Sequence, residues 1–294
     1  MVSIGIDAQV ALLFDRWRHA RRSLIRHNAR PSAVHRWRIC SRRLFALEEL
    51  LAPATQRAER DGVRALLDAA FHAAGQLRDA QVAIGQLQPL SRRFSVAGRL
   101  AHHLRRRLPR QRERVTLLIR AIKPRAVRRT LLRWGLLRDP DEERLAARAA
   151  RRLQRAHLGL RRAQSRRRSA RSLHQYRVRL KSLRYMEEIS RAAGWGPASQ
   201  RITPRQIDRM QRKLGRIVDL EVLSRLLDRY TVKHPARRRE SALLHNRLRQ
   251  LPMGIGGASM KNSCTVRNRH RIFWSHHVKH RHRQAGRGSA RRHR

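Results

Sequence analysis

Acidic residues, cysteines and aromatic residues are all scarce in this 294-residue chain. Asp and Glu number only 20 against 71 Lys and Arg, so the formal charge is +51. Aromatic residues make up 4% of the sequence, which leaves a core of aliphatic side chains and alanine and favours packed helices over sheets. The two cysteines, Cys40 and Cys264, imply no disulfide framework and fit a reducing cytoplasm.

Long apolar runs are missing too. None approaches the roughly 20 residues that a helix needs to cross a bilayer. The apolar stretch near the N-terminus has no basic region before it and is interrupted by Asp7, which does not fit a signal peptide. We therefore expect a soluble, cytoplasmic protein with no transmembrane segment.

Common catalytic motifs are also absent. The sequence contains no P-loop, G-x-S-x-G or HExxH pattern, and its acids are too few and scattered for a two-metal phosphatase site. The histidines at 102–103 and 276–282 have no Asp, Glu or Cys nearby, which argues against a metal site. We expect a non-enzymatic protein that uses no cofactor and no metal.

What the sequence has in abundance is arginine, because only six of its 71 cationic residues are lysine. Charge repulsion on this scale destabilises a compact fold unless a polyanion or salt screens it. Arginine also presents a planar fork of donors that matches the oxygens of a phosphate group. The composition therefore predicts a polyanionic partner, which could be nucleic acid, inorganic polyphosphate or an anionic membrane surface.

Helical periodicity dominates the chain, and strand-like alternation is hard to find. We predict helices at 7–27, 32–52, 55–88, 92–121, 141–168, 170–193, 203–230 and 236–251. Residues 122–140, which hold prolines and a glycine, are predicted to be a linker between two halves, 7–121 and 141–251. Residues 254–294 are basic, contain no acid and keep no helical period, so we expect a disordered tail there.

Two motifs recur in the same order in both halves. HRWRICSRRLFALEE at 35–49 aligns with HQYRVRLKSLRYMEE at 174–188, an offset of 139 residues. Further on, GQLRDAQVAIGQL at 75–87 aligns with GRIVDLEVLSRLL at 215–227, an offset of 140. Two matches at nearly one offset indicate an internal duplication, so we expect an all-α protein made of two pseudo-symmetric four-helix bundles.

The first repeated motif places its basic residues on one face of a helix. Successive residues advance by about 100°, so the cations of the second copy fall within an arc of roughly 80°. They are His174, Arg177, Lys181 and Arg184, and the first copy has His35, Arg38 and Arg42. Apolar residues lie behind both stripes: Tyr176, Leu180, Leu183 and Met186, and Trp37, Leu44 and Leu47. An extended polyanion laid along each stripe would offset the repulsion between its like charges, whereas the alternative is an ordinary solvated basic face.

Two further pairs of matched residues invite a role. The neighbouring arginines should push His35 and His174 toward their neutral forms, and a bound polyanion would reverse that effect. Asp79 and Asp219 each follow a glycine by four residues, and either could orient an arginine or cap a helix.

The repeated motifs resemble those of the CHAD domain, the conserved histidine α-helical domain. The likeness is most specific at 174–188, extends over about 7–251, and makes residues 1–253 the candidate domain. It implies a basic central groove that binds inorganic polyphosphate, and targeting to polyphosphate granules. Carried over position by position, the polyphosphate contacts would be His35, Arg38, Arg42, Arg43, His174, Arg177, Lys181 and Arg184. The ExExK motif of the triphosphate tunnel domain that often accompanies this family is absent.

Nonspecific binding of RNA or DNA is the main alternative. Counterion release gives any protein this basic some affinity for nucleic acid at low salt. However, the stacking aromatic residues that are typical of single-strand binders are scarce here. The sequence carries no signal for an oligomeric state.

Overall fold

Helices make up all the regular structure in the part of the chain that the computed structural model describes, namely residues 5–52, 61–133, 141–165, 170–195 and 204–250. They belong to one compact unit that spans Met1–Gly254. The prediction of an all-α fold is confirmed within these ranges. The tail predicted at 254–294 lies outside the described residues.

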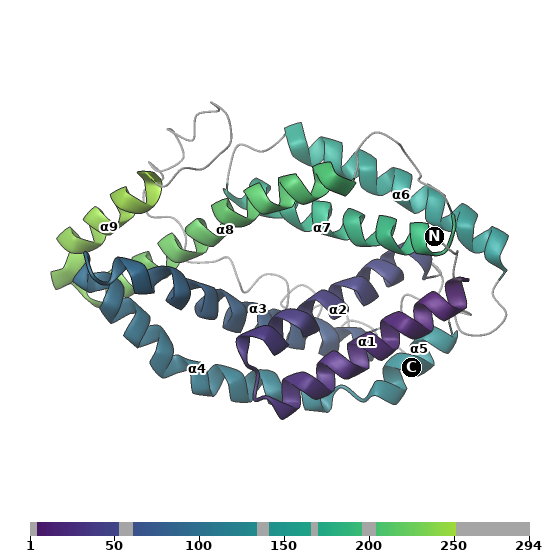
Figure 1. Cartoon of the computed structure of the whole chain (residues 1–294), viewed down its shortest axis with the longest axis horizontal. Coiled ribbons are helices and arrows are strands. Elements are labelled where there is room, and N and C mark those ends of the chain that lie inside the picture. Colours follow the sequence, from purple (N-terminus) through teal and green to yellow (C-terminus); the bar gives the residue numbers. More distant parts are fainter. Residues whose placement is uncertain (1–4, 53–60, 134–140, 166–169, 196–203, 251–294) are drawn as a thin grey trace, which may run out of the picture. The chain divides into compact units, whose positions relative to one another are not determined.

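The helices follow the predicted order closely (Figure 1). They are α1 (Ile6–Arg26), α2 (Pro31–Leu51), α3 (Asp61–Leu90), α4 (Ser95–Ala121), α5 (Pro124–Arg133), α6 (Glu142–Ser165), α7 (Ala170–Ala192), α8 (Pro204–Lys233), a 3₁₀ turn η2 (Pro235–Arg237) and α9 (Arg238–Gln250). The main difference is α5, which occupies the first part of the predicted linker. Val127 and Leu131 of α5 are almost fully buried, so this segment packs against the core instead of connecting two halves loosely.

Prolines and acids mark where several helices begin. Pro31 occupies the first position of α2, where its missing N–H leaves no intrahelical hydrogen bond unmade. At the start of α6, Asp141 Oδ1 accepts a hydrogen bond of 2.9 Å from the backbone N–H of Arg144. Glu142 and Glu143 follow in the first turn, where the helix dipole favours negative charge.

Buried side chains form two clusters, and each cluster draws on both halves of the chain. The larger one combines the apolar faces of α1, α2, α6 and α7 with parts of α3, α4, α5 and α8. The smaller one combines parts of α3, α4, α8 and α9. The two halves therefore share both clusters of buried side chains, while α1, α2, α3 and α4 of the first half also contact one another. The predicted apolar faces are confirmed: Trp37, Tyr176, Leu180 and Leu183 are fully buried.

Some arginines hold the fold together by closing helix ends. Arg148 of α6 donates to the carbonyl of Leu51 at 2.7 Å, at the C-terminal end of α2. Arg152 donates to the carbonyls of Glu49 at 2.7 Å and of Ala52 at 2.6 Å. The last carbonyls of a helix lack intrahelical donors, so these contacts satisfy them and use positive charge where the dipole is negative. Part of the arginine excess is therefore structural.

An acidic side chain caps a helix at its N-terminal end, where the helix dipole is positive. Glu240 of α9 accepts hydrogen bonds from the backbone N–H of Val96 at 2.6 Å and from the Ser95 hydroxyl at 2.9 Å, at the start of α4. Its small burial raises the pKa of Glu240, but these two hydrogen bonds and the charges of Arg237 and Arg99 outweigh that effect and lower it. Glu240 thus ties α9 to α4.

We expect Glu240→Ala to lower the free energy of unfolding by about 1 kcal/mol at neutral pH, the usual cost of losing a capping side chain. Because the pKa of Glu240 is depressed in the folded state, its contribution is present above the ordinary glutamate pKa and is lost as the pH falls through the folded value. Urea unfolding at neutral and acidic pH measures both effects. Glu240→Gln, which keeps an acceptor without the charge, should lose less, and an equal loss for both variants would contradict the charged cap.

Among the described helices, none combines the length and the apolar character that spanning a bilayer requires.

Candidate functional site

The four helices that carry the repeated motifs meet in the middle of the described unit. Helix α2 packs against α7, and α3 packs against α8. Contacts between α2 and α3 and between α7 and α8 complete the arrangement (Figure 1). Residues that are about 140 positions apart in the sequence therefore face one another.

Six of the eight predicted contact residues come together between α2 and α7. This central cationic cluster consists of His35, Arg38 and Arg42 of α2 and His174, Arg177 and Lys181 of α7. Electrostatic interactions cross the helix boundary in both directions. The charge of Lys181 acts on His35, and the charge of Arg42 acts on His174. The two stripes thus face each other and not separate regions of solvent.

The cluster perturbs its own titration strongly. Burial, together with the charges of Arg42, Arg177 and Arg38, lowers the pKa of Lys181 to about 6. Burial and the charge of Arg42 lower the pKa of Arg38 only to about 10. At neutral pH Arg38 therefore keeps its charge, while the Lys181 amine is largely neutral.

Both histidines behave as the sequence suggests, with burial as an additional cause. Burial is the largest effect that lowers the pKa of His35, followed by the charges of Arg78 and Lys181. Burial followed by the charge of Arg177 lowers the pKa of His174. Both imidazoles are therefore held toward the neutral form, in which each can still donate one hydrogen bond.

Two contacts with Phe71 of α3 hold the Arg38 guanidinium in place, and we call this position the seat of Arg38. Its Nη1 donates to the carbonyl of Phe71 at 2.7 Å, and its guanidinium lies 4.4 Å from the centre of the Phe71 ring. A Cβ atom at Gly75 would lie 2.7 Å from Arg38 Nη1, too close for any real contact. Gly75 is therefore the residue that leaves room for the guanidinium, although glycine inside a helix is unfavourable.

Two carboxylates lie among these cations. Asp79 and Asp219 sit inside α3 and α8, far from their ends, so the helix-cap interpretation is wrong. Asp219 Oδ1 lies 3.9 Å from Arg177 Nη2. Burial raises the pKa of Asp79, and the charge of Asp219 raises it further against the opposing charge of Arg38. The acids thus neutralise only part of the cluster.

Two arginines of the site were not predicted. The charge of Arg78 on α3 acts on His35, and the charge of Arg225 on α8 acts on His174 and on Asp79. Both lie within the second repeated motif, but the alignment at offset 140 places Val218 opposite Arg78 and Gly85 opposite Arg225. A search for matched residues therefore passes over them, since only their position in the fold brings them to the cluster.

The remaining predicted contacts, Arg43 and Arg184, lie in an ion-paired group. Arg43 Nη2 is 3.1 Å and Arg184 Nε is 2.8 Å from the carboxylate of Glu188. Arg184 Nη1 is also 2.8 Å from Asp208 Oδ1. These two arginines have carboxylate partners within 3.1 Å, closer than the 3.9 Å that separates Arg177 from Asp219 in the central cationic cluster.

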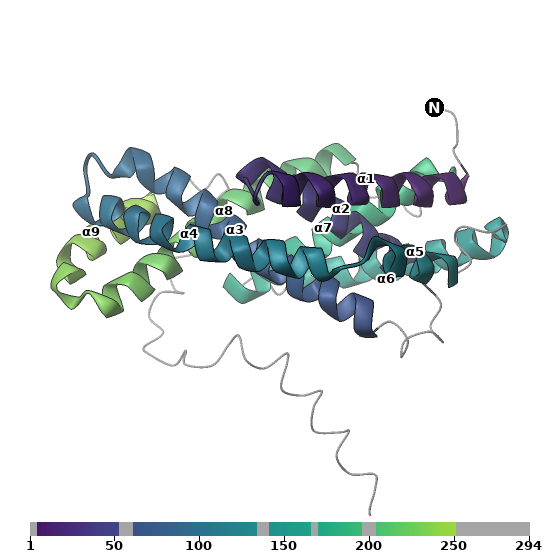
Figure 2. The same cartoon turned by 90° about the horizontal axis from the view of Figure 1, so that it is seen from below.

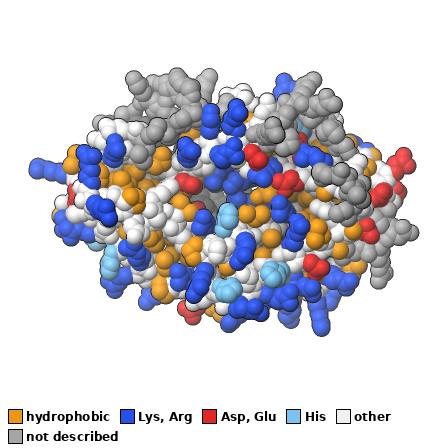
Figure 3. All heavy atoms as spheres, viewed as in Figure 1, with side chains coloured by type: hydrophobic (Ala, Val, Ile, Leu, Met, Phe, Trp, Pro, Cys, Tyr) orange, Lys and Arg blue, Asp and Glu red, His pale blue; other side chains and the backbone are white. Residues whose placement is uncertain are grey.

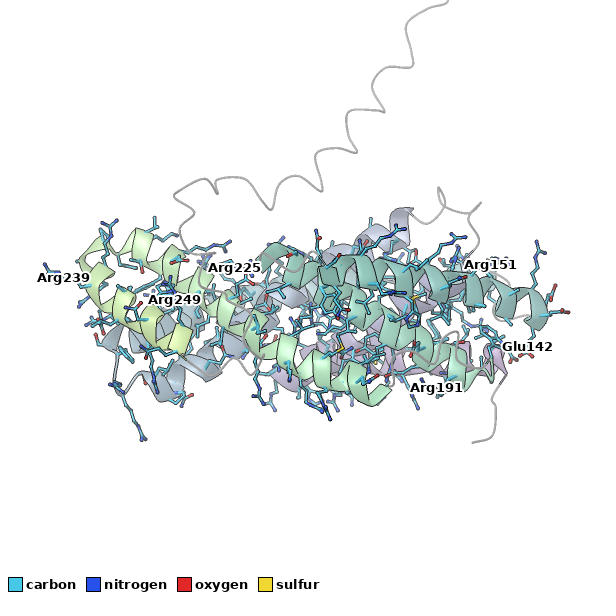
Figure 4. All side chains as sticks on the ribbon, turned by 90° about the horizontal axis from the view of Figure 1, so that it is seen from above. Glu142, Arg151, Arg191, Arg225, Arg239 and Arg249 are labelled. Atoms are coloured by element: carbon cyan, nitrogen blue, oxygen red, sulfur yellow. The ribbon has the colours of Figure 1, made fainter. Side chains whose placement is uncertain are left out.

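Charged side chains lie both near the middle of one face and toward the ends of the described unit (Figures 3 and 4). In the space-filling view, the face is hollowed near its middle, and lysine or arginine, histidine and acidic side chains border the hollow (Figure 3). In the view of Figure 1, this is where α2, α3, α7 and α8 come together. Arg151, Arg191 and Arg239 lie toward the two ends of the described unit and are exposed (Figure 4). Cations therefore also cover the outside of the fold.

Comparisons with known proteins agree on one family. The model of the CHAD domain matches residues 8–228, which include all eight predicted contact residues and end within α8. A solved structure, the crystal structure of the CHAD domain from the plant Ricinus communis, matches with a TM-score of 0.59 and 20% sequence identity, over 83% of each chain. At this identity the likeness concerns the fold alone. No curated protein matches the chain.

Proposed function

Since this chain belongs to the CHAD domain family, we propose that it binds inorganic polyphosphate at the central cationic cluster and catalyses no reaction on it. One observation carries the proposal: cations from two distant segments converge between α2 and α7, with only the carboxylates of Asp79 and Asp219 described among them. A phosphate chain carries an anionic oxygen on each unit and no base, so it can meet several of these cations in succession.

The central cationic cluster is energetically unfavourable when no ligand is bound. Burial penalises the charged forms of Arg38, Arg42 and Lys181, and their mutual repulsion adds to the penalty. A polyanion supplies the missing opposite charge in a partly desolvated place, where charge-assisted hydrogen bonds are strong. Binding therefore relieves a strain that the free fold carries.

We extend the proposal to the architecture of the site. The pairs α2 with α7 and α3 with α8 carry the matching motifs, and each pair is in contact. This supports an internal duplication with a pseudo-two-fold relation and a basic groove between the copies. The binding of polyphosphate would in turn place the protein at cytoplasmic polyphosphate granules, which a fluorescent fusion in cells with and without polyphosphate would test.

Nonspecific nucleic-acid binding is the second candidate, and one surface favours it. Residues 95–133 contain thirteen Lys and Arg and a single acid, Glu113. Helices α4 and α5 follow one another along this region (Figure 2). Most of these cations are exposed. This α4–α5 band, residues 95–133, offers a long basic face of the kind that neutralises a nucleic-acid backbone by counterion release.

A competition experiment with the full chain separates the two candidates. Polyphosphate and duplex RNA of equal total charge compete for the protein at about 150 mM salt, where exposed charges are largely screened beyond 8 Å or so. We expect polyphosphate to displace RNA and RNA to displace little polyphosphate, since the central cationic cluster is buried enough to escape screening. Equal mutual displacement, reduced by Arg106→Gln with Arg110→Gln on the α4–α5 band, would favour the nucleic-acid candidate instead.

Two glycines form a matched test of the seat of Arg38. Gly75 and Gly215 occupy aligned positions inside α3 and α8, but a Cβ at Gly215 meets nothing within 4 Å. We expect Gly215→Ala to stabilise the fold by about 0.5–1 kcal/mol through its helix propensity and to leave polyphosphate affinity unchanged. Gly75→Ala should push Arg38 off Phe71, lose that gain in stability and weaken polyphosphate binding severalfold.

Thermal unfolding and binding titrations of both variants supply the measurements. Gly75 has a role in binding if Gly75→Ala loses stability and polyphosphate affinity relative to Gly215→Ala. If both variants gain equal stability and bind polyphosphate as the parent does, the seat on Phe71 has no part in binding.

A further inference from the structure

The surroundings of Lys181 distinguish it from the other lysines that the structure describes. The guanidiniums of Arg38 and Arg42 on α2 and of Arg177 on α7 act on it, together with the carboxylate of Asp219 on α8. The charge of Lys181 acts in turn on the imidazoles of His35 on α2 and His174 on α7. Its side chain is partly buried but still reaches the surface, whereas Lys123, Lys213 and Lys233 are exposed. The position aligned with Lys181 in the first half is Arg42, so the only amine in the central cationic cluster stands among guanidiniums.

We propose that Lys181 is a site of covalent acylation, and that acyl phosphates, which are anionic acyl donors, react with its amine in preference to the other lysines. This goes beyond polyphosphate binding and does not depend on it, because it needs only the amine and the cations around it. Guanidiniums cannot take the same modification at neutral pH, since they stay protonated and lack a free electron pair on nitrogen.

The reaction uses groups that the cluster already holds in place. The Nζ lone pair attacks the carbonyl carbon of the acyl phosphate and forms a new C–N bond. The bond between that carbon and the bridging phosphate oxygen then breaks. Inorganic phosphate leaves with the electron pair, and the amine nitrogen releases one proton to solvent, which leaves a neutral amide. Arg42 and Arg177 attract the anionic donor and stabilise the negative charge that develops on the leaving phosphate.

The titration of the cluster supports the same conclusion. A pKa of about 6 leaves most of the Lys181 amine unprotonated at neutral pH, whereas an exposed lysine is almost entirely protonated. The free-amine fraction is then about a thousandfold larger at Lys181, and if amines follow a Brønsted slope like that of thiolates, the weaker basicity removes roughly a hundredfold of that gain. About a tenfold preference remains before any attraction of the anionic donor is counted.

The test treats the full chain with acetyl phosphate and follows each lysine by peptide mass spectrometry as a function of pH. We expect Lys181 to react at least about tenfold faster than Lys123, Lys213 and Lys233 at neutral pH. Its rate should level off above about pH 7, while the rates of the exposed lysines continue to rise toward pH 10. Equal rates at all four lysines, or a Lys181 rate that keeps rising to pH 10, would overturn the proposal.

Two controls test whether the high rate at Lys181 comes from the surrounding guanidiniums and not from misfolding or from simple accessibility of the amine. Acetic anhydride, a neutral donor, should show a smaller preference for Lys181 than acetyl phosphate does, because it gains nothing from the guanidiniums. Arg42→Met should move the midpoint of the pH–rate profile of Lys181 to higher pH and lower the Lys181 rate at neutral pH. The exposed lysines of this variant should react as they do in the parent. Thermal unfolding confirms that the variant is folded, and an unchanged Lys181 profile in the folded variant would contradict the role given to the cluster.

Discussion

Replacing Arg42 and Arg177 together by methionine is expected to lower polyphosphate affinity by about 10²–10⁴-fold at physiological salt. The two arginines come from different helices and face the same cluster, where the charge of Arg177 lowers the pKa of Arg42 after burial has done so. Each charge-assisted hydrogen bond to a phosphate oxygen contributes about 1.5–3 kcal/mol, and the two losses add if both residues contact the same chain. Isothermal titration with long-chain polyphosphate measures the effect.

A matched control removes the same charge from the outside of the fold. Arg151 and Arg239 are exposed and lie toward opposite ends of the described unit (Figure 4). Arg151→Met with Arg239→Met should change affinity by less than about threefold, because exposed charges are screened by salt. If this control loses as much affinity as the central pair, binding is spread over the surface and the proposed site is wrong.

Lys181→Met is expected to stabilise the free protein while it weakens polyphosphate binding. The fold holds the pKa of Lys181 at about 6, far below that of an unfolded lysine near 10.4, so folding at neutral pH requires the amine to lose its proton. Methionine has a similar size and no proton to lose, and replacing buried ionisable groups by apolar side chains of similar size commonly stabilises a protein by about 1–4 kcal/mol. A gain in that range, measured by urea unfolding without polyphosphate, is the expected result.

The pH dependence gives this prediction a definite sign. Between about pH 6 and the ordinary lysine pKa, the unfolded state binds more protons than the folded state, so the parent protein becomes more stable as the pH rises. The advantage of Lys181→Met should therefore shrink from pH 6.5 to pH 9.5 or so. Lys213→Met, which removes an exposed lysine, should change stability by less than about 0.5 kcal/mol at every pH. A destabilised Lys181→Met, or one whose advantage does not change with pH, would show that the cluster imposes no such penalty.

Most of the local structure is readable in the sequence. Prolines and helical periodicity predict α1–α4 and α6–α9, and the burial of Trp37, Tyr176 and Leu180 confirms the predicted apolar faces. These properties depend on neighbours within one or two turns, where the spacing of side chains decides which face is buried. The exception is α5, because the prolines and glycine of residues 122–140 are typical of a linker, and only the burial of Val127 and Leu131 against the core shows otherwise.

The roles of individual arginines are much less readable. Arg42, Arg148 and Arg184 have the same side chain, but one faces other cations, one closes the end of α2 and one pairs with Glu188. Helical spacing places Arg184 on the same stripe as Lys181, and nothing local indicates that Glu188 and Asp208 neutralise it. Arg78 and Arg225 join the site without any match in the repeat.

The sequence by itself determined that this protein is helical, that it belongs with the CHAD domains, and that His35, Arg38, His174 and Arg177 lie on cationic stripes. Only the tertiary structure decided that the two stripes face each other between α2 and α7, and that the pKa of Lys181 falls further than that of Arg38. The physical reason is range: periodicity is set by backbone geometry over a few residues, whereas burial and repulsion depend on which charges from distant segments share one poorly solvated space.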